Sequence, residues 1–423
     1  MYDKKTDYTF RSLAVITLAA LFLFYKYILQ ISPSVMSHEL MSAFSLNGAG
    51  LGFMAACYFY TYMILQIPAG LLLDRFGLRL LLTITITVAA IGGVIFSQTN
   101  TVWAADVARG LIGAGAAFGT TGYMKAVNNW APRQHLAIFS GLFGTACMLG
   151  ATFASSPIAI LVTHLGWRQT MLLVGVLGII LALCVGLFVR NGAKEKSEYT
   201  SSGNFLSGLK AVLCTRNNWP LLVFNGIAFA PVAVYGGLWG APFLEQTYHV
   251  SRTHAAFSAS LIFFGLAVGG PILGWLSDHF HHRKRFIYLG TVMSLICLLL
   301  MLYLPGLSMV TIDVLTFLTG LGLSSFLISY TMALEYNSVA HAATAIAVIN
   351  TGSPIFGAIA EPLIGHLLDN GWHGKVGLHG VHIFSTADYH QALIVLPIYL
   401  LIALVAMWLV KEHTIIKSNE DTP

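Results

Sequence analysis

Charged residues are scarce in this sequence: only 9% of its 423 residues are Asp, Glu, Lys or Arg. Soluble domains carry about 25% charged residues, so the composition excludes an ordinary soluble globular protein. Hydrophobic residues make up 57% of the chain, and the mean hydropathy is +0.76. Because a transmembrane helix needs roughly 20 apolar residues, the chain has room for about twelve spans and little else.

Cysteine and catalytic motifs are also scarce. The chain has five cysteines, four of them inside apolar runs, so we expect no disulfide framework. It contains no nucleophile elbow, phosphate-binding P-loop, HExxH helix or paired-cysteine signature. Histidines around the last predicted external loop have spacings that match no metal motif; they are His366, His373, His379, His382 and His390. We therefore predict that the protein is not an enzyme and binds no cofactor and no metal.

Long apolar windows predict an all-α membrane protein with twelve transmembrane helices in two pseudo-symmetric six-helix bundles. The windows lie near 13–36, 48–72, 78–98, 101–126, 136–160, 167–190, 217–244, 253–276, 286–304, 308–335, 344–368 and 389–410. With the N-terminus inside, most of the 22 Lys and Arg residues fall in cytoplasmic segments, as the positive-inside rule requires. We expect both termini to be cytoplasmic, and we read the net charge of +5 as a topology signal rather than a nucleic-acid site.

A polar stretch near the middle of the chain divides two halves that share a pattern. Gly70-x3-Asp74 recurs as Gly274-x3-Asp278 in the second half. Such repeats are typical of secondary transporters, whose substrate sites lie between the repeats near the bilayer midplane. The predicted organisation is a first bundle at 1–190, a central cytoplasmic linker at 191–216 and a second bundle at 217–423.

The loop between the second and third predicted helices reads GLLLDRFGLR, and a related loop, GWLSDHFHHRKR, follows the eighth helix. Glycine permits a close helix approach or a tight turn, and a carboxylate can pair with an arginine or face a helix N-terminus. Contacts of this kind form in one global state and break in another, so we predict a gate. The predicted gating residues are Gly70, Asp74, Arg75, Gly77, Arg79, Gly274, Asp278 and Arg283.

These features together resemble the major facilitator superfamily over essentially the whole chain. The resemblance rests on the two sets of six helices, the central basic loop, the GLLLDRFGLR loop, and Arg109 with Gly113 and Gly115 in the fourth helix. It implies that Asp74, Arg75 and Arg79 form a cytoplasmic latch and that Arg109 takes part in proton coupling. The second loop departs from the family pattern at His281, where glycine is usual, so its turn geometry and its latch role are open.

Two segments are similar to a narrower group within the superfamily. They read YKYILQISPSV and GHLLDNGWHGKVGLHGVHIFSTADYHQAL. The group occurs in intracellular gammaproteobacteria and includes phagosomal nutrient transporters and siderophore transporters. This resemblance implies a location in the bacterial inner membrane.

Ionisable residues inside the predicted helices mark a transport pathway, because they are costly in hydrocarbon. Lys26 lies near the middle of the first helix, with Gln30 on the same face, and Arg109 lies within the fourth. The alternatives are structural: Lys26 pairs with a neighbouring helix, and Arg109 is tied to a backbone carbonyl or to Asp106. The predicted substrate-binding residues are Lys26, Gln30, Tyr58, Tyr62, Arg109, Tyr235, Trp239 and Asn350.

The second half contains acidic residues inside its predicted helices, opposite in charge to these cations. Glu361 lies well inside the eleventh helix, and Asn350 lies on the same side of it. A carboxyl group in such a place can exchange a proton, with a permanent ion pair as the alternative. Glu335 lies toward the inner end of the tenth helix, where a solvated role is an equal alternative. The predicted proton-coupling residues are Glu361, Arg109 and Glu335.

The sequence therefore predicts a secondary transporter that works by alternating access and couples transport to protons. The expected substrate is a small zwitterionic or anionic organic solute, such as an amino acid, a short peptide or a related nutrient. One alternative is an exporter or importer of a siderophore or another polycarboxylate metabolite, and another is a non-transporting membrane sensor. The expected partners are the small-molecule substrate, protons and the lipid bilayer, with no nucleic acid, and the protein is expected to be a monomer.

Overall fold

The computed structural model describes residues 4–131, 136–189, 205–338, 341–377 and 381–410, and these segments are almost entirely helical. The first half of the chain contains α1 (Lys4–Ile31), η1 (Ser32–Val35), α2 (Ser37–Phe44), α3 (Gly48–Phe76), α4 (Leu78–Gln98), α5 (Val102–Ala116), α6 (Phe118–Trp130), α7 (Leu136–Leu165) and α8 (Trp167–Phe188). The second half contains α9 (Phe205–Cys214), α10 (Asn218–Pro231), η5 (Val232–Trp239), α11 (Gly240–Tyr248), α12 (Arg252–His279), α13 (Arg283–Tyr303), α14 (Met309–Leu323), η6 (Ser324–Leu327), α15 (Ile328–Tyr336), α16 (Ala342–Asn350), α17 (Gly352–Gly371), α18 (Thr386–Leu393) and α19 (Val395–Leu409).

The prediction of an all-α protein with twelve spans is confirmed. Within the described segments, 11 helical stretches are long and apolar enough to cross a membrane. The remaining predicted span, near 101–126, is α5 followed directly by α6, with 15 and 13 residues. The helix is interrupted at Ala117, which separates the two pieces, so neither piece has the length of a span by itself.

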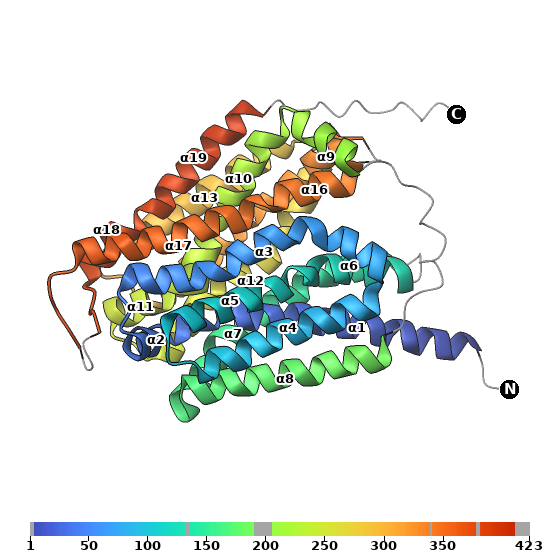
Figure 1. Cartoon of the computed structure of the whole chain (residues 1–423). Helices are drawn as coiled ribbons and strands as arrows, with labels where there is room; N and C mark the ends of the chain where they lie inside the picture. Colours follow the sequence, from blue (N-terminus) through green and yellow to red (C-terminus); the bar gives the residue numbers. More distant parts are fainter. Residues whose placement is uncertain (1–3, 132–135, 190–204, 339–340, 378–380, 411–423) are drawn as a thin grey trace.

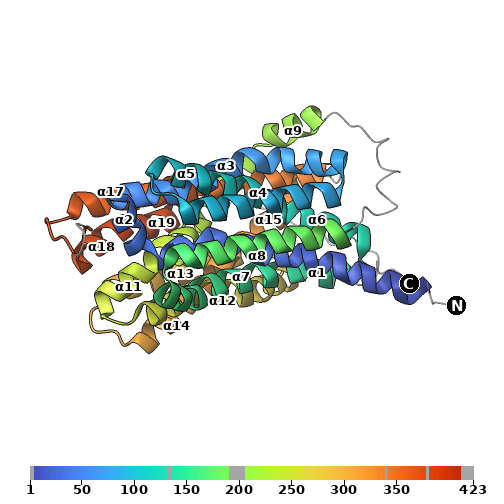
Figure 2. The same ribbon diagram turned by 60° about the horizontal axis from the view of Figure 1, so that its bottom comes forward.

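The helices of each half pack mainly against one another. In the first half, α4 packs against α5 and α8, and α1 packs against α7; in the second half, α14 packs against α12 and α13. The halves meet where α3 packs against α17 and where α7 packs against α12. Figure 1 shows α3 and α17 side by side, and Figure 2 gives the same arrangement from another direction.

One end of the molecule carries polar contacts between the halves, and we call it the closed end. It is the end at which α2, α11 and α18 lie, opposite to α9 (Figures 1 and 2). The Asp369 carboxylate accepts hydrogen bonds from the backbone N–H groups of Gly48 (2.8 Å) and Ala49 (2.7 Å) at the start of α3. Arg252 pairs with Glu39 at 2.5 Å. These contacts join the first half to the second.

Glycine lets the two backbones approach at the closed end. A Cβ atom on Gly52 of α3 would lie 2.4 Å from the carbonyl oxygen of Glu361 on α17, which is closer than real Cβ atoms come. Position 52 therefore admits no side chain while the halves are docked, because the opposing atoms are backbone.

Part of the predicted linker lies outside the described residues. This applies to residues 191–204, whereas Phe205–Cys214 forms α9 and α10 begins at Asn218. The predicted division of the chain at 190 and 217 stays a prediction.

Candidate functional site

Lys26 lies on α1 in the middle of the molecule, and only 3% of its surface is exposed. Its Nζ atom donates hydrogen bonds to Thr120 Oγ1 (3.1 Å) and to the Tyr62 hydroxyl (3.4 Å). The same nitrogen lies 5.1 Å from the ring centre of Tyr27 and 5.2 Å from that of Tyr62. Among the described residues, no carboxylate lies within ion-pair distance of it. Lys26 is thus a buried cation held by neutral groups.

Arg109 of α5 is buried with a different set of partners. Its guanidinium group donates to the carbonyl oxygens of Leu29 (2.7 Å) and Gln30 (3.3 Å), and its carbon lies 5.5 Å from the Tyr58 ring centre. Both carbonyls belong to the last turn of α1, where carbonyl groups lack partners within the helix and the dipole favours a cation. The structure thus shows the backbone tie that was the structural alternative. The Nε atom remains buried without a hydrogen-bond partner.

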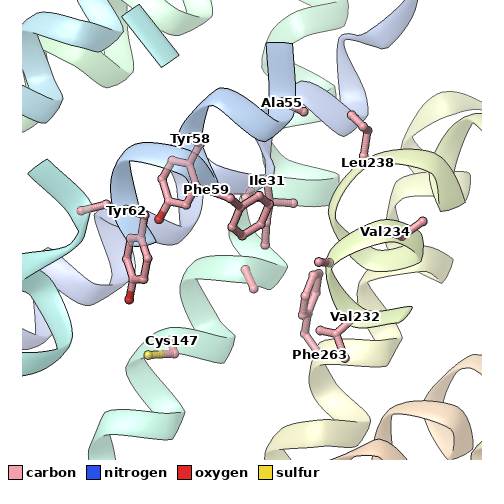
Figure 3. Packing of buried hydrophobic residues seen from close by; sticks show 14 of the residues in the cluster. Ile31, Ala55, Tyr58, Phe59, Tyr62, Cys147, Val232, Val234, Leu238 and Phe263 are labelled. Atoms are coloured by element: carbon pink, nitrogen blue, oxygen red, sulfur yellow. The ribbon is translucent and has the colours of Figure 1, made fainter. Parts of the chain in front are cut away.

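Two tyrosines of α3 connect the cations. Tyr58 donates a hydrogen bond to Gln30 Oε1 (3.2 Å), and its ring stacks on that of Tyr62 at 5.7 Å between centres. The residues are one helical turn apart, and Figure 3 shows them projecting together from α3. The structure therefore brings together five of the predicted substrate-binding residues, which are Lys26, Gln30, Tyr58, Tyr62 and Arg109.

Glu361 of α17 faces this cluster from the second half. It is 3% exposed, and its Oε2 atom is buried without a hydrogen-bond partner. The carboxyl group interacts electrostatically with Arg109, although no ion pair joins the two residues within the described part of the chain. The Glu361 backbone oxygen accepts a hydrogen bond of 3.3 Å from Trp239 Nε1. The predicted Trp239 thus supports the α17 backbone at the acidic residue.

The other predicted residues of the second half have separate surroundings. Tyr235 packs against Phe243, with 6.5 Å between ring centres, and its hydroxyl is buried. Asn350 accepts a hydrogen bond of 2.7 Å from the Tyr330 hydroxyl. Both are contacts within the second half, so the structure does not add Tyr235 to the cluster around Lys26.

Sequence reasoning missed a neutral polar network in the second half. Asn225 of α10, which is fully buried, donates to Ser329 Oγ (3.0 Å) and accepts from Ser353 Oγ (2.9 Å). It joins α10, α15 and α17. The available signal was a single Asn in the apolar run LLVFNGIAFAP. Such a residue in a span needs hydrogen-bond partners and so points to a neighbouring polar helix face.

The second copy of the gate forms a charged cluster. Arg283 at the start of α13 bonds with Asp278, with Glu335 (3.1 Å) and with Ser277 Oγ (3.1 Å). Glu335, predicted to couple protons, is thus the ion-pair partner of a predicted gating residue. His281 has a φ of +55°, so the tight turn persists where the family pattern has glycine.

The first copy of the gate has a different backbone. Gly77 has φ +82° and ψ 160°, Arg79 Nε donates to the Gly186 carbonyl (2.7 Å), and the Arg75 guanidinium lies 5.3 Å from the Phe76 ring centre. The side chain of Asp74 lies outside the described part of the structure. These contacts stay within the first half.

The close helix approach that Gly70 permits is not made by the described residues. Among them, a Cβ atom on Gly70 would lie 3.9 Å from Thr121 Cγ2, its nearest contact, and one on Gly274 would meet nothing within 4 Å. The gating role of these two glycines stays a prediction.

The histidines of the last loop are dispersed. His382 stacks on Trp372 with 3.7 Å between ring centres, and its Nδ1 atom lies 3.5 Å from Asp369. His373 lies 3.6 Å from Asp388, and His379 lies outside the described residues.

Comparisons with known proteins agree with this architecture. The profile of the Major Facilitator Superfamily matches residues 13–360 and again residues 221–422. The chain is 21% identical to the uncharacterized transporter YybO of Bacillus subtilis, over 81% of this chain and 84% of that protein. It is 22% identical to the probable sulfoacetate transporter SauU of Cupriavidus necator, over 84% and 87% of the two chains.

Two further similarities extend the comparison. A probable L-galactonate transporter of Escherichia coli is 25% identical over 62% of each chain. A bacterial homologue of the human lysosomal transporter Spinster, solved in an inward-facing and unoccupied conformation, has the same fold. Its TM-score is 0.77 at 16% identity, over 95% of this chain and 97% of the other. With the family profile matching most of its length, the chain belongs to the Major Facilitator Superfamily and is a multi-pass membrane transporter rather than an enzyme.

Proposed function

We propose that this protein is a proton-coupled carrier for a small anionic or zwitterionic organic solute. Lys26 and Arg109 in the first half hold the anionic group of the solute. Glu361 in the second half carries the proton or meets an amino group of the solute. These roles use the charges that the fold buries between its halves, where transporters of this kind bind substrate.

The observation that carries the proposal is the state of Lys26. A buried ammonium group is costly unless an anion or a full set of hydrogen bonds compensates it. Here two neutral hydroxyl groups and two aromatic rings surround it, and none of the described carboxylates pairs with it. A carboxylate, phosphate or sulfonate on a solute supplies that charge. Names of relatives support an organic anion, since one is a probable sulfoacetate transporter and another a probable L-galactonate transporter.

Alternating access follows from the placement of the charges on opposite halves. Cations on the first half and a carboxyl group on the second engage one ligand only when the halves approach each other, so the ligand selects a closed state. With both termini in the cytoplasm, as the basic residues predict, the closed end faces outward. The present arrangement is then inward-facing, and transport requires the Asp369 and Glu39 contacts to break.

The test is uptake into proteoliposomes that carry an imposed proton gradient. Glu361→Gln is expected to abolish gradient-driven accumulation while it retains exchange of solute between the two sides, because exchange needs no net proton movement. Glu245→Gln is the matched control, since Glu245 lies at the closed end on α11 and is partly exposed. Unchanged accumulation by Glu361→Gln would remove Glu361 from the coupling role.

The same assay separates a carrier from the membrane-sensor alternative. A sensor binds solute, so the purified protein would be stabilised against thermal unfolding by the ligand. It would nevertheless show neither accumulation nor exchange in proteoliposomes. That combination would overturn the proposed transport.

A further inference from the structure

The short helix α9 (Phe205–Cys214) lies at the edge of the helix bundle and at the boundary of the membrane. It packs against α16 and α10, which both belong to the second half. Figures 1 and 2 show it at the periphery, at the end opposite to the closed end. The span Asn218–Tyr248 begins directly after the turn 215–217 that follows α9. Since this turn extends over at most about 14 Å, the end of α9 lies close to the level of the lipid headgroups.

Hydrogen bonds fix the corner between α9 and α10. The Asn218 side-chain amide donates to the Val212 carbonyl oxygen (2.8 Å), and the Trp219 indole donates to that of Leu213 (2.9 Å). Asn218 also exchanges two hydrogen bonds with Asn337, just after α15, at 3.1 and 2.9 Å. These bonds satisfy carbonyl groups in the last turn of α9 and hold the helix in one orientation on the second half.

The two faces of α9 differ in exposure. Gly208 and Val212, one turn apart, are buried, and a Cβ atom on Gly208 would lie 3.2 Å from His341 Cδ2. Lys210 and Leu213, also one turn apart, are exposed on the other face. A helix that presents a basic and an apolar side chain together at this level is typical of helices that lie in the plane of the membrane interface.

The turn after α9 extends the same basic and apolar surface. Arg216 is exposed, and Trp219 has 52% of its surface exposed although its indole N–H is bound. Tryptophan is enriched at the membrane interface, where its ring lies among the headgroups. The sequence contains no Asp or Glu from residue 199 to residue 244, and no described carboxylate pairs with Lys210 or Arg216. The surface therefore carries a net positive charge.

We propose that Lys210, Leu213, Arg216 and Trp219, which we call the α9 surface, bind anionic phospholipids of the adjacent leaflet. Lys210 and Arg216 bind the phosphate groups, while Leu213 and Trp219 enter the boundary with the acyl chains. Each basic residue near an anionic leaflet is attracted to it, and burial of the apolar side chains adds to the affinity. Because α9 packs on α16 and α10, this binding ties the second half to one leaflet. It requires no assumption about the transported solute.

The test follows a nitroxide spin label at Cys214, an exposed residue of α9. Full-length protein without the other cysteines is placed in nanodiscs of phosphatidylcholine with a rising fraction of phosphatidylglycerol. The anionic lipid is expected to raise the collision rate of the label with oxygen, which dissolves in the bilayer, and to lower that with a water-soluble nickel chelate. The measured quantity is the phosphatidylglycerol fraction that gives half of this change.

Lys210→Gln and Arg216→Gln are each expected to raise that fraction about fivefold, because each removes one basic residue from the α9 surface. Arg285→Gln is the matched control, since Arg285 is an exposed cation at the start of α13 and is not part of the α9 surface. Lys210→Arg keeps the charge and should behave as the wild type, which separates a loss of charge from a disturbed helix.

Two results would overturn the proposal. If the label keeps the same collision rates at every phosphatidylglycerol fraction, the α9 surface does not bind anionic lipid. If Arg285→Gln raises the half-maximal fraction as much as Lys210→Gln does, the lipid responds to the net charge of the protein and not to this surface.

Discussion

The two halves of the chain line the centre of the molecule with different chemistry. The first half presents Lys26 and Arg109, both buried and both bound by neutral groups. The second half presents Glu361 and the neutral network around Asn225. Two related sets of helices can therefore keep the same arrangement while the side chains that they direct to the centre differ. The solute proposed above, which pairs an anionic group at the cations with a second group at Glu361, has to bridge both halves.

The two cations of the first half differ in the groups that bind them. Arg109 compensates the carbonyl end of α1, so part of its role is structural. Within the described segments, the partners of Lys26 are hydroxyl groups and aromatic rings. In the proposed anion site, Lys26 is therefore the cation with the fewest structural ties, whereas Arg109 also holds the end of α1 in place.

The largest effect on stability is expected for Arg109→Gln. The substitution removes two charged hydrogen bonds to carbonyl groups at the end of α1, and such bonds contribute about 1.5–3 kcal/mol each. A loss of about 3 kcal/mol or more in unfolding free energy follows, seen as a lower thermal unfolding temperature in detergent. Arg168→Gln is the matched control, because Arg168 also binds carbonyl oxygens but lies in the first turn of α8 and is partly exposed. If the Arg109→Gln protein is as stable as the wild type, Arg109 does not hold the end of α1 in place.

Lys26→Met is expected to leave stability unchanged or raise it, because an apolar chain of similar length replaces a buried charge that pairs with no carboxylate in the described part of the chain. Affinity for an anionic solute should fall at least about 30-fold, since removing one member of a buried charge pair costs about 2 kcal/mol or more. Thermal unfolding with and without solute measures both quantities.

Lys125→Met serves as the comparison variant for this second test. Lys125 Nζ donates to the Leu73 carbonyl (2.8 Å) at the end of α3, so its loss should affect stability and not solute affinity. A Lys26→Met protein that unfolds easily and keeps its affinity would show that Lys26 is structural.

A smaller effect on free energy is expected at the closed end, where the Asp369 carboxylate of the second half binds the first turn of α3. Asp369→Asn keeps the shape but removes the charge at the helix N-terminus, which contributes about 1 kcal/mol. The equilibrium constant for separation of the halves at this end should then rise about fivefold. Spin labels at the exposed positions His38 and Val376, in a protein without other cysteines, measure the distance distribution.

The control for this gate variant is Asp388→Asn. Asp388 caps α18 in a capping box with Ser385, entirely within the second half. It should lower stability without changing the label distances. If Asp369→Asn leaves the distance distribution as in the wild type, the Asp369 contact is not a gate.

Sequence patterns predicted the spans because long apolar runs leave no other solution in a bilayer. Local departures from regular helix were not predicted: the interruption at Ala117 and the wide turn of η5 lie inside apolar runs whose composition does not change there. Lys26, Arg109 and Glu361 stood out because charge is rare in a span.

The contact of Asp369 with α3 illustrates a second limit. Asp369 lies at the end of a predicted span, where an acidic residue is ordinarily solvated. Its partners are backbone N–H groups some 320 residues earlier, and backbone groups carry no sequence signal. Docking of one half on the other creates this site, so it could not be read from either half alone.

A contrast between the two halves is also expected at the paired gate turns, which occupy equivalent positions with different residues. Gly77 has φ +82° and ψ 160°, a region open essentially only to glycine, whereas His281 has φ +55°, where histidine is tolerated. Gly77→Ala should therefore cost about 1–3 kcal/mol of unfolding free energy, while His281→Gly should change it by less than about 1 kcal/mol, as thermal unfolding in detergent would show. A large loss in His281→Gly would mean that the imidazole makes a contact essential to the second gate; equal small effects in both would mean that neither turn is strained and that the two gates are interchangeable.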